Sequence, residues 1–536
     1  MNERYAQALA KSWKRFGVEK PIPKPDIHDR LPQDVLDKMK NPDQMTAAET
    51  VTTQTTDAVR FQGAVKRLRD FFRGRTAKPM VEMRQDYTQQ RATQSAAREE
   101  AMRRRREELE RRVAEQRQAA NRTQSDGQGL TQPVQQPATE PVAKEKTPES
   151  APIQSKLHTF TYYGTQMGVD MGDLTQTLRI RDLQPQTVAN AWTLCSKRQY
   201  TGLIQDCLEL RDQYNLCDWA YLQMLKTMAD TYLGKDTNES TFLTAYIFCQ
   251  SGYRIRLAQN GENLLMLFGS EHTVYDYPYF KMDGINLYPL GAKVSRLSTI
   301  QACDKAINNS EQSLSLMIDS EPDLTPSDSK LRVIESVKYP DIRMEVTVNE
   351  NLIKFFNDYP VSGATNDPLS KWAMYANTPM AEDVKAQVYP VLKQSLQGLS
   401  EQDQVRRLLS LIQPREWDKP STSLQYEYDD KLWGHDRVFF AEETLFYPYS
   451  DCEDHAILFS RLVRDLVGLK VMLVYYPGHL AAAVRFSQPL TGKYQDRLIL
   501  ASGDEYYICD PTNYIPEPGV TMQGMNNSQA QVILLD

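Results

Sequence analysis

The chain has 536 residues, more than one hydrophobic core organises, so we expect several domains. Its hydrophobic fraction of 40% is low, which indicates that part of the chain buries no core. The net charge of -7 is modest for this length and argues against a nucleic-acid partner. The sequence contains no apolar run long enough to predict a membrane span.

The N-terminal segment MNERYAQALAKSWKRFGVEK lacks the continuous apolar stretch of a secretory signal. We expect an extracytoplasmic protein, periplasmic or secreted, if a signal peptide has been removed, and a cytoplasmic protein otherwise. The cysteines are dispersed, odd in number and without a CxxC motif. This pattern predicts neither a disulfide framework nor a structural zinc site.

The first two of five predicted regions precede the compact protein. Residues 1–83 mix short helical patterns with the proline-rich segment PIPKPDIHDRLP, which must be extended or turning. Residues 84–155 are predicted to form a charged, solvated helix and then a disordered linker rich in Pro, Gln, Thr and Glu. Glutamates surround the arginine run 103–106, which indicates a charged exposed face rather than a nucleic-acid site.

The compact protein is predicted to begin near Leu157, where HTFTYYG has the composition of a strand. Residues 156–290 are predicted to form a mixed α/β domain, with helical spacing followed by the strand-like runs YRIRLAQ, NLLMLFG, HTVYDYPYF and INLYPL. Residues 291–360 contain further strand candidates, SLSLMI and IRMEVTV, and are predicted to form a small β-rich module. Helical spacing resumes over 367–413 within a C-terminal domain of residues 361–536.

Two segments of the chain share one succession of features. NESTFLTAYIFCQSGYRIRLAQ and DCEDHAILFSRLVRDLVGLKVMLVYY each have an acidic start, an apolar helix, a glycine and a strand. The first has Glu239 near the helix start, where the second has Cys452. One interpretation of this shared succession is that residues 156–290 are a degenerate second copy of the C-terminal fold that has lost the nucleophile. The alternative is coincidence, because helix, glycine and strand often follow one another.

Cys452 lies where a helix is predicted to begin. Ser450 or Asp451 can cap the first turn, AILFSRLVRDLV supplies an apolar stripe, and Gly468 ends the helix. Free N–H groups and the positive end of the helix dipole favour a thiolate there and can stabilise an oxyanion. Glu453 and Asp454 suit a helix N-terminus but oppose thiolate formation, so a cationic partner is expected nearby.

His479 and Asp510 complete a candidate triad with Cys452. KVMLVYY is a predicted strand, Pro-Gly is a turn, and His479 begins the next strand, HLAAAVRF. LILA and YYICD are predicted to form a hairpin around SGDE, and Asp510 ends its second strand before Pro511. Adjacent strands lie about 5 Å apart, so Asp510 can orient His479, and a helix packed on the sheet can bring the thiol to the other ring nitrogen. This is the nucleophile, base and orienter of acyl transfer.

In this segment the chain resembles the transglutaminase-like superfamily, whose papain-related fold has a Cys–His–Asp triad in this order. The motifs that match are YSDCEDHA, YPGHLAAAVRF and YYICDPT, with LQYEYDD similar to the aromatic segment that precedes the Cys helix. The resemblance covers about residues 400–520, and residues 157–536 more loosely resemble a group of bacterial transglutaminase-like proteins, many of them exported.

This resemblance implies an α+β fold in which the Cys helix packs on an antiparallel sheet. It assigns Cys452 as nucleophile, His479 as base and Asp510 as orienter, with Tyr426 as a candidate for the site wall or oxyanion hole. The implied activity is thiol-dependent acyl transfer on a peptide or protein amide, without a metal or other cofactor.

Hydrolysis by a peptidase or amidase is preferred to transamidation, because nothing in the sequence identifies an amine acceptor site. The alternative is a catalytically inactive binding or scaffolding module with the same fold. The expected partner is a protein or peptide substrate, and the sequence does not predict an oligomeric state.

His455 departs from the triad pattern and places a second imidazole one helical turn from Cys452. A zinc site made by Cys452, His455, His479 and Cys509 is a rival interpretation, since tetrahedral zinc needs three or four converging ligands. Cys509 and Asp510 alternate on their predicted strand, so only one of them can face the site. This alternation disfavours zinc.

Overall fold

The computed structural model describes residues 2–24, 53–54, 157–197, 200–291, 298–303, 311–336, 338–364, 367–412, 425–426, 433–513 and 515–535. These residues belong to one compact unit of helices and mainly antiparallel sheets, so the architecture is α+β. The predicted charged helix and linker lie outside the described residues, as does most of the predicted region 1–83. The division of residues 156–536 into three regions stays a prediction.

The helical spacing predicted ahead of the strand-like runs of residues 156–290 is confirmed. The helices of this part are α1 (Asn2–Leu9), α5 (Leu174–Thr177), α6 (Pro185–Lys197), α7 (Thr201–Gln213), α8 (Asp218–Leu233) and α9 (Asn238–Gln250). Pro185 opens α6 at a position where the missing N–H has no helical partner to lose. Trp192 of α6 meets Tyr246 of α9 edge-on, with ring centroids 5.0 Å apart, so aromatic packing joins the two helices.

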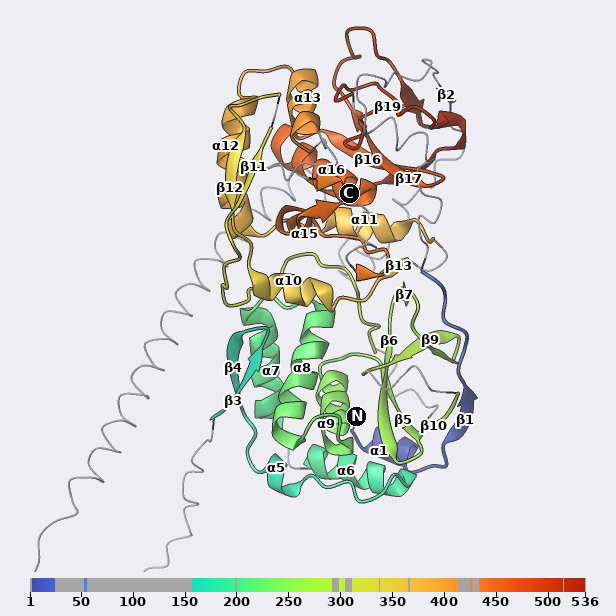
Figure 1. Ribbon diagram of the computed structural model, residues 1–536. Coiled ribbons are helices and arrows are strands. Elements are labelled where there is room, and N and C mark those ends of the chain that lie inside the picture. Colours follow the sequence, from blue (N-terminus) through green and yellow to red (C-terminus); the bar gives the residue numbers. More distant parts are fainter. Residues whose placement is uncertain are drawn as a thin grey trace, which may run out of the picture. The chain divides into compact units, whose positions relative to one another are not determined.

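A six-stranded sheet combines the N-terminal strand β1 with five strands that follow α9 in the chain. Its strands are β1 (Lys14–Gly17), β5 (Ile255–Asn260), β6 (Asn263–Gly269), β8 (Phe280–Met282), β9 (Ile285–Pro289) and β10 (Thr299–Ala302). They lie in the order β1-β10-β5-β6-β9-β8, and every neighbouring pair is antiparallel. Helix α9 packs against β5 and β6, with α8 beside it (Figure 1).

Three short antiparallel pairs accompany the larger sheets. They are β3 (Leu157–Tyr162) with β4 (Thr165–Asp170), β7 (His272–Val274) with β13 (Ser362–Ala364), and β11 (Arg332–Glu335) with β12 (Arg343–Val346).

The strand predicted from SLSLMI is wrong, because this segment forms only an isolated bridge between Leu314 and Ser270. The N–H of Leu314 donates to the carbonyl of Gly269, but the next backbone donors bind side chains instead of a neighbouring strand. The N–H of Ser315 donates to Asp218 at 3.0 Å, and that of Leu316 donates to His272 at 3.2 Å. Such local competition removes the hydrogen bonds that a sheet ladder requires.

The helical spacing predicted over residues 367–413 is also confirmed. The helices between the two large sheets are α10 (Glu350–Asn357), α11 (Ser370–Asn377), α12 (Glu382–Leu396), α13 (Glu401–Ile412) and α15 (Ala441–Phe446). Helices α11, α13 and α15 all contact α16 (Cys452–Leu462), so the predicted Cys helix lies within a helical layer.

A second six-stranded sheet lies against α16. Its strands are β2 (Thr53–Gln54), β16 (Lys470–Tyr476), β17 (His479–Arg485), β18 (Arg497–Ile499), β19 (Glu505–Ile508) and β20 (Gln531–Leu534). The order is β2-β18-β19-β17-β16-β20, and only the short β2 runs parallel to its neighbour. The predicted strands KVMLVYY and HLAAAVRF and the hairpin around SGDE are confirmed.

Helix α16 begins and ends where the sequence predicts. It starts at Cys452, continues into a π-helical turn over Val463–Val467, and stops at Gly468, whose φ of 78° is left-handed. Glycine adopts this conformation without the steric cost that a Cβ would add.

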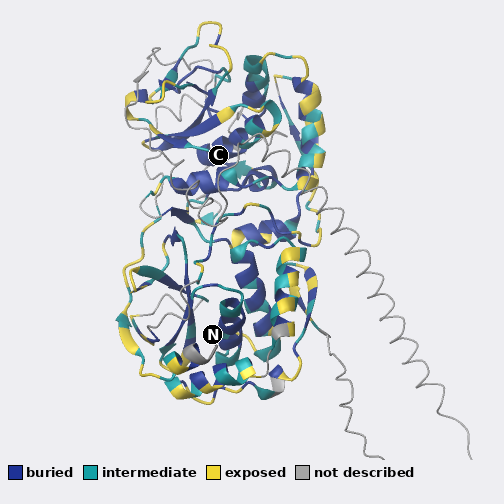
Figure 2. Ribbon diagram, turned by 180° about the vertical axis from the view of Figure 1, so that it is seen from behind, coloured by how far each residue is buried: buried dark blue, intermediate teal, exposed yellow. Residues whose placement is uncertain are grey.

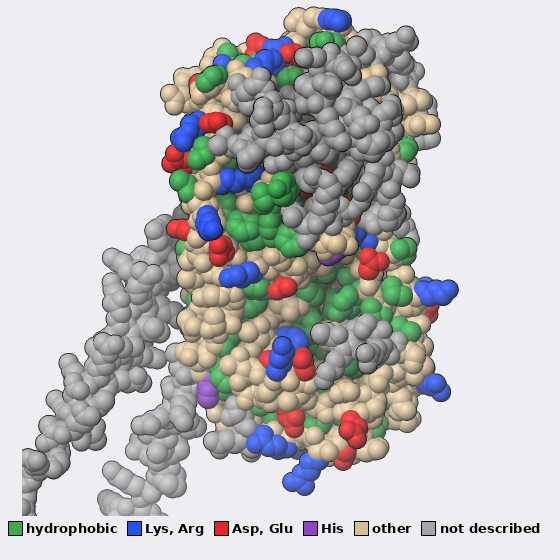
Figure 3. Space-filling model, in the orientation of Figure 1, with side chains coloured by type: hydrophobic (Ala, Val, Ile, Leu, Met, Phe, Trp, Pro, Cys, Tyr) green, Lys and Arg blue, Asp and Glu red, His purple; other side chains and the backbone are tan. Residues whose placement is uncertain are grey.

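Buried residues line both large sheets and the central helices, while exposed residues concentrate on the outer faces (Figure 2). The alanines of β17, from Ala481 to Ala483, are fully buried. Ala482 packs in the cluster that contains α16, and its small side chain allows the helix to lie close to the sheet, whereas Ala481 and Ala483 belong to the cluster on the other face. On the face drawn in Figure 3, basic and acidic side chains intermingle among the described residues. Within the described ranges, no helix combines the length and hydropathy needed to cross a membrane.

Candidate active site

The start of α16 is held by a carboxylate from its own first turn. Asp454 accepts hydrogen bonds from the backbone N–H of Asp451 at 3.1 Å and from that of Phe439 at 2.9 Å. The first of these bonds is the reciprocal half of a capping box, and the second ties the helix start to the preceding segment. Cys452 is therefore presented by a rigid helix terminus.

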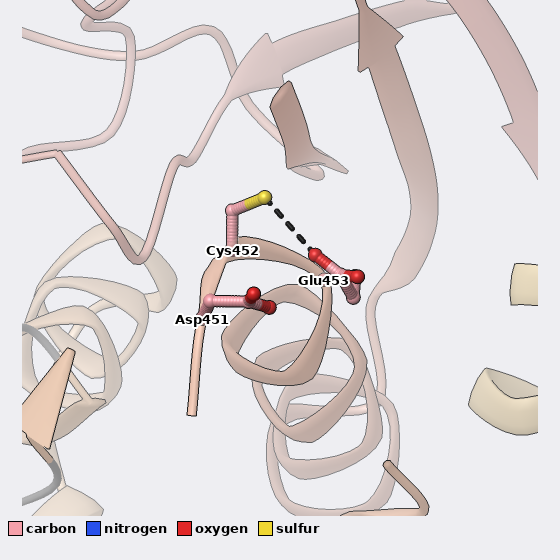
Figure 4. Close-up of side chains that lie close together, drawn as sticks. All are labelled: Asp451, Cys452 and Glu453. Carbon is pink, nitrogen blue, oxygen red and sulfur yellow. Dashed lines mark hydrogen bonds between the residues drawn. The ribbon is translucent and has the colours of Figure 1, made fainter. Parts of the chain in front are cut away.

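The Cys452 thiol is buried among carboxylates. Cys452 is 4% exposed, and its Sγ–H donates to Glu453 Oε2 at 3.1 Å, with Asp451 beside the pair (Figure 4). Burial raises the pKa of this thiol well above its ordinary value, and the charges of Glu453 and Asp451 raise it further. The backbone N–H of Leu480 interacts with the sulfur and opposes that rise. In this arrangement the sulfur is a thiol, and a proton acceptor is required to form the thiolate.

His479 and Asp510 form a buried pair at the start of β17. The Nε2–H of His479 donates to Asp510 Oδ2 at 2.8 Å, and the backbone N–H of Thr512 donates to Asp510 Oδ1 at 2.9 Å. With Nε2 as the donor, Nδ1 is an acceptor, and it has no hydrogen-bond partner among the described residues. An imidazole oriented by a carboxylate, with a vacant acceptor nitrogen, has the properties of a general base.

The nucleophile candidate and the base candidate come from elements in contact. Helix α16 packs on β17, and the amide of Leu480, the residue after His479, reaches the Cys452 sulfur. The His479–Asp510 hydrogen bond is formed, whereas the thiol hydrogen bond goes to Glu453. The structure thus packs the helix that begins at Cys452 against the strand that begins at His479, and the thiol bonds to a carboxylate that sequence reasoning regarded only as an unfavourable charge.

His455, the second imidazole near Cys452, is hydrogen-bonded to Ser450 in the structure. Its Nε2 lies 2.9 Å from Ser450 Oγ, in the segment that leads into α16. Burial lowers the pKa of His455 to about 3, and the charge of Arg332 contributes to that shift. His455 is therefore neutral, and its hydrogen bond with Ser450 fixes the segment that precedes Cys452.

Tyr426 lies on β14 (Gln425–Tyr426), which pairs in parallel with β15 (Tyr449–Ser450). The backbone of Tyr426 is opposite Ser450, two residues before Cys452. This register places it near the helix start, although its side chain lies outside the described part of the structure.

The four ligands of the rival zinc interpretation do not gather among the described residues. The metal-type donors that do converge are Asp451, Cys452 and Glu453, whose ligand atoms lie within 4.8 Å of one another. Cys509 is instead a buried strand residue whose N–H donates to the carbonyl of Ala482 at 2.8 Å. Two carboxylates and a thiol could hold a divalent cation, but acidic groups also cluster without one.

A buried lysine acts on Glu453, the carboxylate that accepts the thiol hydrogen bond. Lys371 of α11 is fully buried, and its charge lowers the pKa of Glu453, while burial and the charge of Asp436 raise it. The Lys371 ammonium also lies 4.5 Å from the centroid of the Trp372 ring. Sequence reasoning missed Lys371 because no motif links α11 to the Cys helix.

Comparisons with known proteins identify no relative for this chain. No family model matches it. Neither the curated proteins nor the solved structures contain a match. The site is therefore interpreted from its own geometry and from the resemblance of its short motifs.

Proposed function

We propose that the protein catalyses thiol-dependent acyl transfer on a peptide or protein amide, with Cys452 as nucleophile, His479 as base and Asp510 as orienter. The observation that carries this proposal is the buried hydrogen bond between His479 and Asp510, which leaves His479 Nδ1 without a hydrogen-bond partner among the described residues. His479 begins strand β17, and β17 packs against the helix that begins at Cys452. The motif resemblance to transglutaminase-like proteins supports the same assignment of roles.

The first step transfers the thiol proton from Cys452 Sγ to His479 Nδ1. For this transfer the sulfur must exchange its hydrogen bond with Glu453 for one with the imidazole. Asp510 stabilises the imidazolium that forms, because its carboxylate already accepts the Nε2–H. The thiolate then attacks the amide carbonyl carbon, and free N–H groups in the first turn of α16 stabilise the oxyanion.

The second step breaks the amide bond. The imidazolium of His479 protonates the leaving amine, the C–N bond breaks, and a thioester joins the acyl group to Cys452. Water activated by His479 then attacks the thioester, the C–S bond breaks, and the thiol regains its proton with release of a carboxylic acid. An amine in place of water would produce a new amide. Hydrolysis is preferred, because none of the described features identifies an amine acceptor site.

Alkylation kinetics test the nucleophile and base together. The rate constant for iodoacetamide at Cys452, followed by peptide mass spectrometry from pH 5 to 10, is compared between the wild type and His479→Ala. The rate is referred to that of a free model thiol, and because burial and the neighbouring carboxylates raise the pKa of Cys452, the effect of the imidazole is the diagnostic quantity. We expect His479→Ala to slow alkylation of Cys452 at pH 7 about tenfold or more. The buried Cys509 is an internal control for unfolding, since it gains reactivity only if the fold opens.

Two results would contradict the proposal. One is a Cys452 that reacts no faster than the model thiol and is insensitive to His479→Ala. The other is hydrolysis of fluorescent casein, or incorporation of a fluorescent amine into it, that is unchanged in Cys452→Ala. The balance between these two casein assays distinguishes a hydrolase from a transamidase.

A second candidate function is a catalytically inactive binding or scaffolding module. The specific observation in its favour is the buried thiol bonded to Glu453, whose raised pKa opposes thiolate formation. This function predicts an alkylation profile in which Cys452 titrates well above a free thiol, with and without His479.

A further inference from the structure

The two large sheets have the same topology. In each, five strands, numbered by their order in the chain, lie in the order fifth, first, second, fourth, third: β10-β5-β6-β9-β8 in one and β20-β16-β17-β19-β18 in the other. In the first sheet, β7 intervenes between the second and third of these strands and pairs with β13 instead. All of these neighbouring pairs are antiparallel, and in each case a helix, α9 or α16, immediately precedes the first strand and packs on the first two. A shared order of five strands is harder to explain by coincidence than a shared helix–glycine–strand succession.

The registers also agree. The first hairpin closes at the pair Asn260↔Asn263 in one sheet and at Tyr476↔His479 in the other, each across a two-residue turn. Asn263 therefore occupies the position of His479, as the first residue of the second strand.

The helix starts are tied to these hairpins in the same way. Asn238 is the first residue of α9, and its Oδ1 accepts the backbone N–H of Leu264 at 2.8 Å. Cys452 is the first residue of α16, and its sulfur interacts with the backbone N–H of Leu480. Each of these leucines directly follows the first residue of the second strand. Asn238 is thus the counterpart of Cys452, one residue before the Glu239 that sequence comparison indicated.

The fourth strand supplies the third correspondence. The N–H of Leu290 donates to the carbonyl of Met266 at 2.9 Å, and the N–H of Cys509 donates to the carbonyl of Ala482 at 2.8 Å. Met266 and Ala482 are both the fourth residue of their strands, β6 and β17. The residue that follows the donor in the chain is Gly291 after Leu290 and Asp510 after Cys509.

We infer that residues 237–302 are a second, non-catalytic copy of the unit formed by residues 451–534, with Asn238, Asn263 and Gly291 at the positions of Cys452, His479 and Asp510. The correspondence rests on the backbone, and only the chemical meaning of the three positions rests on the proposed function.

Each replacement removes one element of the proposed chemistry. Asn238 is not a nucleophile, and its amide is occupied on both sides, since its Nδ2 also donates to the carbonyl of Glu262 at 3.1 Å. Asn263 is exposed and cannot titrate as an imidazole does. Gly291 has no side chain, and its φ of 112° disfavours any other residue. The first copy therefore has a structural role. Asn238, at the position of the nucleophile, attaches the β5–β6 hairpin to helix α9 through its two hydrogen bonds.

The inference predicts that an imidazole at position 263 will act on a thiol at position 238. In the Cys452→Ser protein, the double variant Asn238→Cys with Asn263→His is compared with Asn238→Cys with Asn263→Gln. Iodoacetamide labelling at position 238 is measured from pH 5.5 to 9 by peptide mass spectrometry. We expect about tenfold faster labelling at pH 7 with Asn263→His, and a profile with an added inflection near the imidazole pKa, about 6.5. A variant with Glu262→His in place of Asn263→His should lack both effects.

Rates that agree within about twofold between Asn263→His and Asn263→Gln would overturn the inference. The parallel comparison of Cys452 with and without His479→Gln separates it from the proposed function. If the imidazole accelerates labelling at position 238 but not at Cys452, the duplication is supported and the catalytic role of Cys452 is refuted. If it accelerates labelling at Cys452 but not at position 238, the catalytic role is supported and the duplication is refuted. Absence of both effects refutes both.

A reverse substitution keeps the inference testable if the double variant does not fold. In Cys452→Asn the new amide should accept the N–H of Leu480 as Asn238 accepts that of Leu264. We expect a higher Tm for Cys452→Asn than for Cys452→Leu, a residue of similar size that cannot accept a hydrogen bond. A lower Tm for Cys452→Asn would count against the equivalence.

Discussion

Burial and the neighbouring Glu453 together keep the Cys452 thiol protonated in this structure. Glu453 follows Cys452 in the chain, accepts the thiol hydrogen bond at 3.1 Å, and raises the pKa of the thiol through its charge. Lys371 and Asp436 act on Glu453 in opposite directions, so the charge of this carboxyl depends on residues distant in sequence. The reactivity of Cys452 is therefore set by a cluster and not by the helix terminus alone.

Glu453→Gln should increase the reactivity of Cys452. The amide preserves the shape of the side chain but removes the charge, so the pKa of the thiol falls. Each unit of decrease raises the thiolate fraction about tenfold at a pH below that pKa. The measurement is the alkylation rate at pH 8, with Glu453→Asp as the charge-preserving control. Equal rates in the wild type and Glu453→Gln would show that burial alone suppresses the thiolate.

The triad candidates were predictable at the level of single residues because each one lies at a recognisable boundary. Cys452 begins a helix, His479 follows Pro-Gly, and Asp510 precedes Pro511. The hydrogen bond from Cys452 to Glu453 was not predictable, because side-chain conformation at a helix start depends on what covers it. Lys371 was missed for the same reason, since its burial beside Glu453 is a tertiary property.

Helices α9 and α16 show how one element can be used in two ways. Both begin beside a hairpin and present their first residue to the leucine N–H that follows the turn. In α16 this residue is Cys452, the candidate nucleophile. In α9 it is Asn238, whose amide makes two hydrogen bonds and provides no nucleophile.

Asn238→Ala should destabilise the first copy. It leaves the buried N–H of Leu264 and the carbonyl of Glu262 without their amide partner, which costs about 2 kcal/mol in the free energy of unfolding. Urea denaturation followed by far-UV circular dichroism measures the change. Asn263→Ala is the matched control, because this side chain is exposed and its loss should cost less than about 0.5 kcal/mol. Similar losses in the two variants would contradict the structural role of Asn238.

In the molecule as a whole, a carboxyl pair joins distant parts of the chain. Glu321 lies in the segment after the first sheet, and Glu442 lies in α15 beside α16. Burial raises the pKa of both groups, and the protonated Glu321 donates a hydrogen bond to Glu442, which also accepts the backbone N–H of Ala381. Lys385 and Asp383 act on Glu321 with opposite signs. Burial of a shared proton makes this contact sensitive to pH.

Stability should decline with rising pH through the titration of Glu321. Its folded pKa is well above the ordinary 4.5, so the folded state binds more protons than the unfolded state above that value. The contribution is complete below pH 4.5 and is lost as the pH rises through the folded pKa, by about 1.4 kcal/mol per pH unit. Urea denaturation at pH 5 and pH 8 should therefore show a larger decline in the wild type than in Glu321→Gln.

Glu345→Gln is the control for this experiment, because Glu345 is exposed and should behave as the wild type does. An equal decline in the wild type and Glu321→Gln would show that the pair does not bind the extra proton.

Local sequence patterns were sufficient for the α+β class, for the main helices and strands, and for the three candidate residues at their ends. Apolar periodicity and turn residues act over a few positions, so the chain displays them directly. Tertiary structure decided that SLSLMI is not a strand, that the Cys452 thiol bonds to Glu453, and that Asn238 is the counterpart of Cys452. These outcomes depend on which backbone donors, carboxylates and strands meet after folding, and residues far apart in the chain make those contacts.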